Sequence, residues 1–313
     1  MNDEPDPELE AAARLLEASP HYRVLRRFVP RDDFGVAEVR ELREAVVVDT
    51  ETTGTDFERD RIIELAMVRF AYDASDGRIV HVSDVYGSLE DPGVPIPPET
   101  TAIHGITDDM VAGHQIDDEA VAAMLEDVEW VVAHNAAFDR PLLERRLPLF
   151  AARRWACSVA DIAWKREGFS GAKLEYLALE HGFFFDGHRS EIDCRAVLEV
   201  LRTPLPRGGV IPWRKVIDSA ARTTYRVWAL NAPIESKDLL KARGYRWDGG
   251  RRIWHREMDR DAAAAEAPWL REQVYGGRNV EVEIEVVDAL CRYSRRPGRR
   301  VLRRLRPDEA SGA

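Results

Sequence analysis

Two carboxylates follow a short apolar run near residue 50, and their spacing suits metal chemistry. Residues 46–48 are all valine, and Asp49 and Glu51 come directly after them. β-Branched residues favour a pleated, covered surface, so the run predicts a buried strand. Positions i and i+2 of a strand point to the same side, which places both carboxylates on one face. The simpler interpretation is a polar strand end before a turn. Because two buried like charges need a neutralising cation, the pair predicts half of a divalent-metal site.

A second acidic segment lies at residues 134–139, with the sequence His-Asn-Ala-Ala-Phe-Asp. It follows an apolar run that predicts a strand over residues 129–133, and it opens a predicted helix over about 137–147. Asp139 has two interpretations, a metal ligand or a first-turn acid that faces the positive end of the helix dipole. Asn135 is a candidate N-cap for the same helix. This segment alone leaves both interpretations open.

A third segment lies at residues 188–193, with the sequence His-Arg-Ser-Glu-Ile-Asp. His188 and Asp193 fit a base beside a metal ligand. Ser190 and Asp193 also fit a capping box at the start of a helix predicted over residues 190–202. Taken singly, this segment is explained equally well by helix capping.

The three segments together form a specific pattern along the chain. Asp-x-Glu, then Asp, then His-x4-Asp resembles the DEDDh 3′–5′ exonucleases, the group that includes the proofreading epsilon subunit of DNA polymerase III. The resemblance covers about residues 45–202 and includes His-Gly-Ile-Thr at residues 104–107. It departs from the family at Ser190, where alanine is more frequent. The resemblance implies a ribonuclease H-like α/β fold and hydrolysis of phosphodiesters from a 3′ end with two Mg²⁺ or Mn²⁺ ions.

The resemblance also implies a role for each residue of the pattern. Asp49 would bridge the two ions, while Glu51 and Asp193 would hold the ion that carries the attacking water. Asp139 would serve the other ion, and His188 would accept the proton of that water. General chemistry agrees with these roles, because Mg²⁺ prefers carboxylate oxygens and two ions can hold the attacking and leaving oxygens. Histidine suits a base because its unperturbed pKa is about 6.5.

Substrate contacts are implied on both sides of the site. The main chain near Gly54 would approach the terminal nucleotide, because glycine permits close backbone contact. Ile103 and His104 would contact the terminal base or its phosphate, although His104 also fits a turn before Gly105. The implied substrate contacts are Thr52, Thr53, Gly54, Ile103, His104, Asn135 and Phe138.

Composition limits the class of protein. The 313 residues allow about two domains, and a hydrophobic content of 45% allows a proper core. The net charge of −11 argues against a non-specific nucleic-acid coat protein but suits a site that binds cations. No apolar run approaches the roughly 20 residues of a membrane span, and the acidic N-terminus predicts no secretory signal. Three widely separated cysteines fit a reducing cytoplasm.

The expected organisation is an α/β exonuclease domain with additions at both ends. Three strands, predicted over residues 45–50, 61–71 and 77–87, form a meander and therefore a mixed sheet. Helices are predicted to flank it near residues 117–126, 137–147, 157–167, 173–181 and 190–202, and a further helix is predicted over residues 19–28. The expected segments are a helical extension (1–44), the exonuclease domain (45–203), a linker (204–222), an accessory domain (223–290) and a flexible Arg-rich tail (291–313).

The accessory domain is expected to be small, aromatic-rich and α+β. Its pattern of tryptophan, arginine and glycine resembles a small bacterial module of unknown function. Strands are predicted over residues 225–230 and 280–286, a hairpin around 248–250, and helices over 236–243 and 260–273. Its aromatic residues either stack on bases or form the core that so small a domain needs. The nucleic-acid contacts expected under the first interpretation are Trp228, Trp247, Arg251 and Trp254.

The sequence therefore predicts a cytoplasmic 3′–5′ exonuclease that releases nucleoside monophosphates, with DNA favoured as substrate. The expected partners are nucleic acid, as single strands or 3′ ends, and a DNA polymerase or repair complex, with no membrane. One alternative is an RNA exonuclease, and another is a non-catalytic nucleic-acid-binding module on the same fold. Four carboxylates and a histidine favour the enzyme, because binding alone needs none of them.

Overall fold

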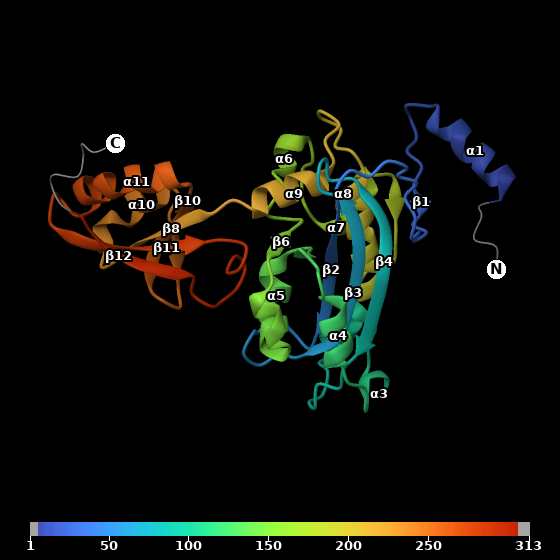
Figure 1. The fold of residues 1–313 in the computed structure, drawn as a ribbon, viewed down its shortest axis with the longest axis horizontal. Helices are drawn as coiled ribbons and strands as arrows, with labels where there is room; N and C mark the ends of the chain where they lie inside the picture. Colours follow the sequence, from blue (N-terminus) through green and yellow to red (C-terminus); the bar gives the residue numbers. More distant parts are fainter. Residues whose placement is uncertain (1–5, 306–313) are drawn as a thin grey trace. The chain divides into compact units, whose positions relative to one another are not determined.

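The computed structural model describes residues 6–305 of the chain. The chain folds into two compact units, Met1–Ser219 and Ala220–Ala313, coloured blue to yellow and orange to red in Figure 1. Every helix within the described residues is too short or too polar to cross a lipid bilayer.

A five-stranded mixed sheet forms the centre of the first unit (Figure 1). In spatial order its strands are β4 (Ile79–Leu89), β3 (Ile62–Asp73), β2 (Leu42–Thr52), β5 (Trp130–Ala133) and β6 (Trp155–Cys157). Neighbours among β2, β3 and β4 are antiparallel, whereas β5 pairs in parallel with both β2 and β6. The predicted meander and mixed sheet are therefore confirmed.

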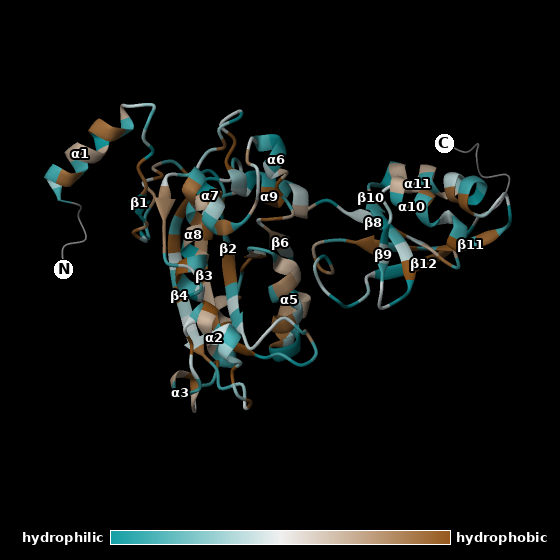
Figure 2. Cartoon of the chain, turned by 180° about the vertical axis from the view of Figure 1, so that it is seen from behind, coloured by the Kyte–Doolittle hydropathy of each residue, from teal (hydrophilic) through white to brown (hydrophobic). Residues whose placement is uncertain are grey.

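Helices cover both faces of this sheet, which explains why its central strands are apolar without alternation. α7 (Leu174–Glu180) and α8 (Ser190–Arg202) lie over one face (Figure 2), and α4 (Asp118–Met124) and α5 (Ala136–Arg146) lie over the other (Figure 1). The smaller helical segments are α2 (Pro98–His104), α3 (Asp108–Val111), η1 (Pro148–Ala152) and α6 (Trp164–Glu167). The helix-flanked mixed sheet confirms the predicted ribonuclease H-like architecture.

The packing of α8 follows from its apolar residues. Cys194, Val197, Leu198 and Leu201 are buried, and they recur at positions i, i+3, i+4 and i+7, which form one stripe of a helix. This stripe packs against β2 and β3. The N-terminal turn of α8 is thereby held beside the end of β2.

One strand of the sheet, β6, was not predicted. Its last residue, Cys157, and the turn after it lie in the segment predicted to be helical over residues 157–167, of which only Trp164–Glu167 forms α6. All three residues of β6 are buried. Three buried residues carry no period, so the pattern cannot distinguish a strand from a helix.

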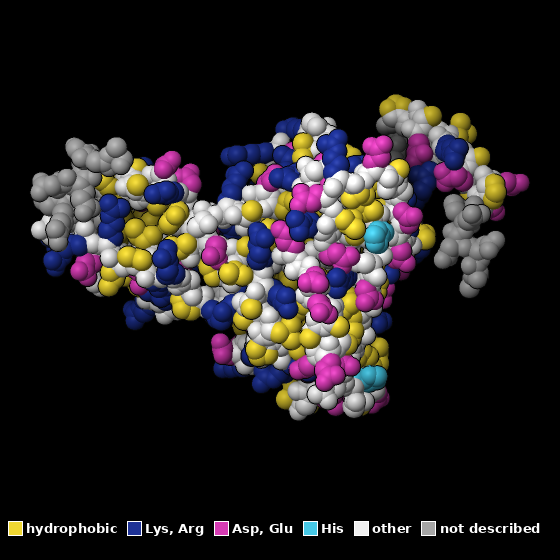
Figure 3. Space-filling model, viewed as in Figure 1, with side chains coloured by type: hydrophobic (Ala, Val, Ile, Leu, Met, Phe, Trp, Pro, Cys, Tyr) yellow, Lys and Arg dark blue, Asp and Glu magenta, His cyan; other side chains and the backbone are white. Residues whose placement is uncertain are grey.

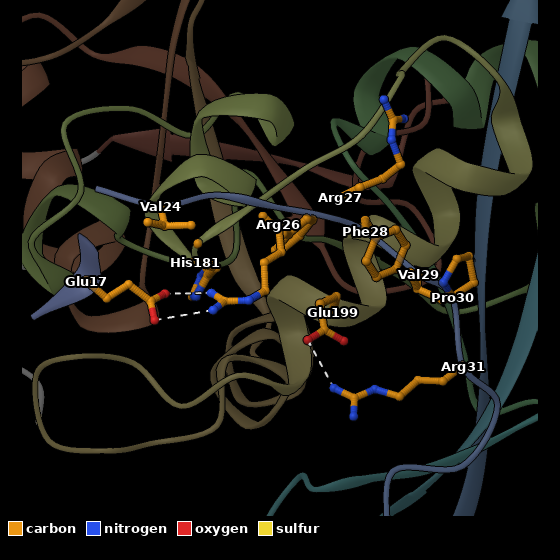
Figure 4. Close-up of a pocket in the computed structure, with 12 residues that line it drawn as sticks. Glu17, Val24, Arg26, Arg27, Phe28, Val29, Pro30, Arg31, His181 and Glu199 are labelled. Atoms are coloured by element: carbon orange, nitrogen blue, oxygen red, sulfur yellow. Dashed lines mark hydrogen bonds and ion pairs between the residues drawn. The ribbon is translucent and has the colours of Figure 1, made fainter. Parts of the chain in front are cut away.

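The N-terminal segment packs along the first unit in a partly extended form. α1 (Pro7–Glu17) begins after the capping residue Asp6, but the helix predicted over residues 19–28 is wrong. β1 (Arg26–Arg27) pairs there in parallel with β7 (Phe183–Phe184). Figure 4 shows the guanidinium of Arg26 bonded to Glu17 at 2.5 Å, and that of Arg31 facing Glu199 at 3.5 Å. Strand pairing and these ion pairs replace the expected apolar helix face.

The second unit is an antiparallel sheet with helices packed on one face. In spatial order its strands are β12 (Arg299–Leu305), β11 (Val280–Val287), β8 (Thr224–Ala229), β10 (Ile253–Met258) and β9 (Arg246–Asp248). Its helices are the 3-10 turn η2 (Ile234–Ser236), α10 (Lys237–Ala242), α11 (Arg260–Trp269) and the π-helical turn η3 (Leu270–Val274). Val227, Leu240, Tyr245, Leu270 and Val282 belong to its apolar core. The predicted α+β accessory fold is confirmed.

Two segments predicted without regular structure contain it. The segment 291–313 was predicted as a flexible tail, but Arg299–Leu305 forms β12 and pairs with β11. The predicted linker at 204–222 contains α9 (Pro212–Ala220). Flexibility beyond Pro307 concerns residues outside those that the structure describes.

α9 is anchored to the first unit by Trp213. This side chain is fully buried and packs edge-on against Phe70 at 5.3 Å and Tyr72 at 5.4 Å between ring centroids. Both partners lie on β3. A chain that ended near Thr203 would lose this contact, so the first unit extends to Ser219.

Trp213→Ala is expected to destabilise the first unit by about 3–5 kcal/mol, because the substitution leaves a large cavity beside β3. Chemical denaturation of the full chain measures the change. Tyr22→Ala is the control, since Tyr22 is 61% exposed. Equal, small effects of both substitutions would show that α9 does not belong to the first unit's core.

Candidate active site

Three carboxylates converge at the end of β2. Asp49 and Glu51 lie on β2, and Asp193 lies in the first turn of α8. Each offers an oxygen atom, and these atoms lie within 4.8 Å of one another. All three side chains are half-buried. The predicted placement of Asp49 and Glu51 on one face of the strand agrees with this geometry.

Burial raises the proton affinity of all three carboxylates, and repulsion from neighbouring carboxylates adds to it for Asp49 and Glu51. Burial, followed by repulsion from Asp139, Asp193 and Glu51, raises the pKa of Asp49 well above its ordinary value. Burial and then the charge of Asp193 raise the pKa of Glu51 to about 8. Burial raises the pKa of Asp193 to about 6. Charged carboxylates are therefore unfavourable here without a cation.

Asp139 adds a fourth acid to this region. It is 2% exposed on α5, and its Oδ1 accepts a hydrogen bond of 2.9 Å from the hydroxyl of Thr50. Burial raises its pKa to about 7, against the opposing effect of the Thr50 hydrogen bond. Its oxygens stand outside the group of three within 4.8 Å. Its charge nevertheless raises the pKa of both Asp49 and Glu51.

The donor set suits a divalent cation. Within the described residues, none of Asp49, Glu51 and Asp193 makes an ion pair with Lys or Arg. Clustered carboxylate oxygens are the ligands that Mg²⁺ and Ca²⁺ prefer. A bound cation would remove the repulsion that raises the pKa values. The residues present therefore fit a divalent-metal site.

His188 lies beside the same carboxylates. It is exposed on the loop before α8, with a left-handed backbone at φ 67°. It lines a cavity of about 980 Å³ together with Asp49 and Asp193. Lys173 and Tyr176, near the start of α7, line the cavity too. The sequence did not indicate these two, because nothing local to them relates them to the acidic segments.

The loop that carries His188 is fixed by Glu64 on β3. The carboxylate of Glu64 accepts hydrogen bonds from Arg189 Nη2 and from Ser190 N, both at 3.0 Å. Glu64 is 8% exposed and stands directly opposite Glu51 in the β2–β3 register. The guanidinium of Arg189 thus neutralises a carboxylate that would otherwise repel Glu51. No role was predicted from the sequence for Glu64 or Arg189.

The start of α8 does not form the alternative capping box. Arg189 is the N-cap, and Ser190 is the first helical residue. Asp193 Oδ2 accepts a hydrogen bond of 3.0 Å from the backbone N–H of Arg189. This hydrogen bond to Asp193 therefore holds the loop, and Ser190 is not the cap.

The predicted substrate residues after β2 form a tight turn. Thr52 Oγ1 donates to the Gly54 carbonyl at 2.6 Å, and Thr53 Oγ1 donates to Asp60 Oδ1 at 3.0 Å. A Cβ at Gly54 would lie 2.5 Å from Asp60 Oδ2, so only glycine fits without a shift. The threonine side chains therefore shape this turn.

The other predicted substrate residues lie on α2 and at the start of α5. Ile103 is 58% exposed, whereas His104 is buried and accepts a hydrogen bond at Nδ1 from Ile106 N. His104 Nε2 is buried without a partner. Asn135 is exposed at φ 77° and occupies the N-cap of α5 without a side-chain hydrogen bond. Phe138 is half-buried, 6.0 Å from Phe57 between ring centroids.

The predicted contacts in the second unit differ in exposure. Trp228 is 3% exposed beneath Arg251, whose guanidinium lies 4.1 Å from the ring centroid. Trp254 is half-buried against the apolar core. Trp247 is 50% exposed on β9, 5.4 Å from Trp254 between ring centroids. Packing accounts for Trp228 and Trp254, and Trp247 retains a free surface for stacking.

Known exonucleases share the part of the chain that carries these carboxylates. The exonuclease family model (RNase_T) matches residues 46–201. DNA polymerase III subunit epsilon of Treponema pallidum (strain Nichols) is 34% identical over 164 residues, which are 50% of this chain and 73% of that protein. Exodeoxyribonuclease 10 of Escherichia coli (strain K12) is 39% identical over 133 residues, which are 42% of this chain and 52% of that protein.

Longer relatives match over a small part of their length. DNA polymerase III PolC-type of Clostridium perfringens (strain 13 / Type A) is 32% identical over 166 residues, which are 51% of this chain and 11% of that protein. This chain thus spans between about a tenth and about three quarters of these relatives. The second unit lies outside the family match.

Removing the charge of Glu51 is expected to flatten the pH dependence of stability in metal-free protein. The folded pKa of about 8 exceeds the unfolded value of about 4.3. The folded state then holds more protons between these values, so the unfolding free energy falls as pH rises from about 5 to 8. Melting temperatures in EDTA should show a smaller fall for Glu51→Gln than for the wild type.

Mn²⁺ at pH 8 should raise the wild-type melting temperature more than that of Glu51→Gln, because binding to the folded site stabilises it. Glu119→Gln, an exposed substitution on α4, is the control and should behave like the wild type. Identical pH profiles for all three proteins would contradict the proposed repulsion.

Removing the charge of Glu64 is expected to loosen the His188 loop. Glu64→Gln should speed amide hydrogen exchange over residues 187–190 and weaken Mn²⁺ binding by about 10–100-fold, as loss of a group that orients metal ligands does. Calorimetry measures the binding. Glu44→Gln is the matched control, because Glu44 is a half-buried partner of Arg69 in the same sheet. The same loss in both variants would indicate a general effect on the fold.

Proposed function

Because the chain belongs to the exonuclease family, we propose that it removes nucleoside monophosphates from the 3′ ends of nucleic acid, with DNA as the favoured substrate. Membership rests on the match over residues 46–201 and on 34% identity to an epsilon subunit of which the chain covers 73%. The resemblance to 3′–5′ exonucleases found in the sequence is thus confirmed. The substrate and partners of the whole protein remain proposals.

One observation carries the proposal. Half-buried carboxylates from β2 and α8 meet with oxygens within 4.8 Å, and burial with mutual repulsion raises their pKa values. Such repulsion is costly unless a cation compensates it. A site of this kind on an exonuclease fold favours metal-assisted hydrolysis of phosphodiesters.

The acidic group is able to hold a divalent metal, and the proposed cofactors are two Mg²⁺ or Mn²⁺ ions. Asp49 would contact both, Glu51 and Asp193 one of them, and Asp139 the other. When bound, such ions supply positive charge to the attacking and leaving oxygens of an in-line displacement. The Thr50 hydroxyl holds Asp139 through Oδ1, and a carboxylate has a second oxygen that can serve as a ligand.

His188 is the proposed base. Its ring is exposed, lines the cavity beside Asp49 and Asp193, and makes no hydrogen bond within residues 6–305. It would take the proton from the water that attacks phosphorus, while the bond from phosphorus to the 3′ oxygen of the preceding nucleotide breaks. The hydrogen bonds of Glu64 to Arg189 and Ser190 would keep the ring near this water.

The terminal nucleotide is proposed to lie between the turn after β2 and α2. The backbone of the turn at Thr52, Thr53 and Gly54 offers close approach. Ile103 has a large exposed side chain for a base, and His104 Nε2 is a buried nitrogen without a partner. Asn135 and Phe138 border the same region of the sheet end from α5. Together these residues would contact the last nucleotide of a strand.

DNA is preferred over RNA in this proposal because the relatives include an epsilon subunit of DNA polymerase III and an exodeoxyribonuclease. An RNA exonuclease is the alternative, and a non-catalytic binding module on the same fold is a second. The same relatives support a DNA polymerase or repair complex as partner. The protein is proposed to act in the cytoplasm, in keeping with the three free cysteines of the chain.

The decisive assay presents 3′- and 5′-labelled DNA and RNA oligonucleotides, single- and double-stranded, with Mg²⁺ or Mn²⁺. The wild type should release mononucleotides from 3′ ends, and EDTA should stop the release. Asp49→Ala should abolish it. His188→Ala should lower the rate by about 10²–10⁴-fold, as expected for loss of a general base, while Mn²⁺ binding persists.

Glu119→Gln serves again as the control with unchanged turnover. Release from 5′ ends would overturn the assigned direction, and binding without any turnover would favour the non-catalytic module. Wild-type turnover by Asp49→Ala would remove the carboxylate site from the mechanism.

A further inference from the structure

Within residues 220–305, the helices of the second unit pack on one face of its sheet and leave the other face open. The core beneath α10 and α11 takes alternate residues of β8 and β10, including Val227 and Met258. Alternation places Arg226 and His255 on the opposite face. In the register, Arg246 on β9 stands beside His255, and Arg226 stands beside Glu257. Three neighbouring strands thus bring two arginines and a histidine together.

A cavity of about 380 Å³ opens among these side chains. It is lined by Arg226, Gly244, Arg246, His255, Arg256 and Glu257. Its acid is already engaged, because Glu257 accepts hydrogen bonds from Thr224 Oγ1 at 2.5 Å and Arg226 Nη2 at 2.9 Å. Arg226 also pairs with Glu285 at 3.4 Å, and Arg256 pairs with Glu266 at 3.4 Å. Arg246 is therefore the arginine of this lining that lacks an ion pair among the described residues. In a chain of net charge −11, such a cavity favours an anion.

The polar groups of this cavity are incompletely bonded. Arg226 Nε and His255 Nδ1 are buried without a hydrogen-bond partner. Arg246 is exposed and makes no ion pair among the described residues. Burial and then the charge of Arg226 lower the pKa of His255, while Asp248 opposes this effect and Arg246 adds to it. Buried polar atoms are nearly always satisfied in folded proteins, by protein, water or ligand.

We propose that this cavity binds a backbone phosphate of single-stranded nucleic acid, so that the second unit holds the strand that the first unit degrades. The inference rests on the proposed function. Guanidinium groups match phosphate oxygens and remain charged. The ligand is a nucleic acid, because Trp247 follows Arg246 on the edge strand β9 and is 50% exposed. Alternation turns this ring to the face opposite Arg246, where its cross-strand partner Trp254 packs against the apolar core. A strand that crosses this edge would meet a free guanidinium on one face and a free ring on the other, and groups of these two kinds together bind single strands.

Lys or Arg side chains surround an apolar patch on the face of the second unit seen in Figure 3. Gly244 lines the cavity with a left-handed backbone at φ 94°, which glycine adopts without strain. The structure changes the set of residues that we expect to contact nucleic acid. Trp228 and Arg251 pack on each other, whereas Arg246 and Trp247 present free groups.

The test measures binding of the full chain to fluorescein-labelled oligothymidylate in EDTA, which prevents hydrolysis. A strand of about 30 nucleotides exceeds the roughly 4–16 that one single-strand module covers. Arg246→Gln is expected to lower affinity about 3- to 10-fold. Its plot of log affinity against log salt should be shallower by about 0.7, the contribution of one phosphate contact on a single strand. Arg260→Gln, an exposed arginine without an ion pair at the start of α11, should match the wild type.

Two further comparisons identify which phosphate of the strand the cavity binds. The loss caused by Arg246→Gln should be equal for strands with and without a 5′ phosphate, whereas a loss confined to 5′-phosphorylated strands would overturn the backbone assignment. His255→Gln should lower affinity as well, with an unchanged melting temperature. Wild-type affinity and salt slope in Arg246→Gln would overturn the inference.

Failure of the proposed function is recognised separately. With Mg²⁺ and an oligonucleotide of about four nucleotides, at the low end of the length that one single-strand module covers, Arg246→Gln should turn over at the wild-type rate. Absence of turnover in the wild type itself would contradict the exonuclease function. The salt slopes in EDTA would then still decide whether the cavity binds strands.

Discussion

Repulsion among carboxylates at the end of β2 is the constraint on which the first unit depends. Asp49, Glu51 and Asp193 come within 4.8 Å, and Asp139 adds its charge from α5. A fold that holds four acids together must offset this repulsion with apolar burial elsewhere. The valines of β2 are fully buried because helices cover both faces of the sheet. The same burial keeps the carboxylates in place to receive cations.

The loop before α8 connects the carboxylate site to His188. Glu64 stands opposite Glu51, and its charge would add to the repulsion if Arg189 did not pair with it. The ion pair between Arg189 and Glu64 therefore has two effects. It offsets the charge of a fifth acid, and it fixes the loop. Asp193 joins the same arrangement through the backbone of Arg189. The proposed metal ligands and the proposed base are thus positioned by one set of hydrogen bonds.

The charged side chains of the second unit are arranged differently from those of the first. Its open sheet face carries arginines and glutamates that pair across neighbouring strands, as between Arg226 and Glu285 or Arg251 and Glu283. Cross-strand ion pairs of this kind stabilise a sheet modestly. Arg246 at the edge is left out of the pairing. The two units therefore present opposite chemistry, with clustered acids in one and an uncompensated cation in the other.

The sequence alone determined the acidic motifs, the mixed sheet and the placement of Asp49 and Glu51 on one face, because strand alternation is a local property. Most helix positions followed from apolar spacing for the same reason. Tertiary structure decided the rest. The β2–β3 register, shifted between Glu51 and Thr52, sets Glu64 opposite Glu51. Pairing with β11 makes a strand of an Arg-rich segment, and Phe70 and Tyr72 bury Trp213. These outcomes depend on partners distant in the chain, which no local pattern specifies.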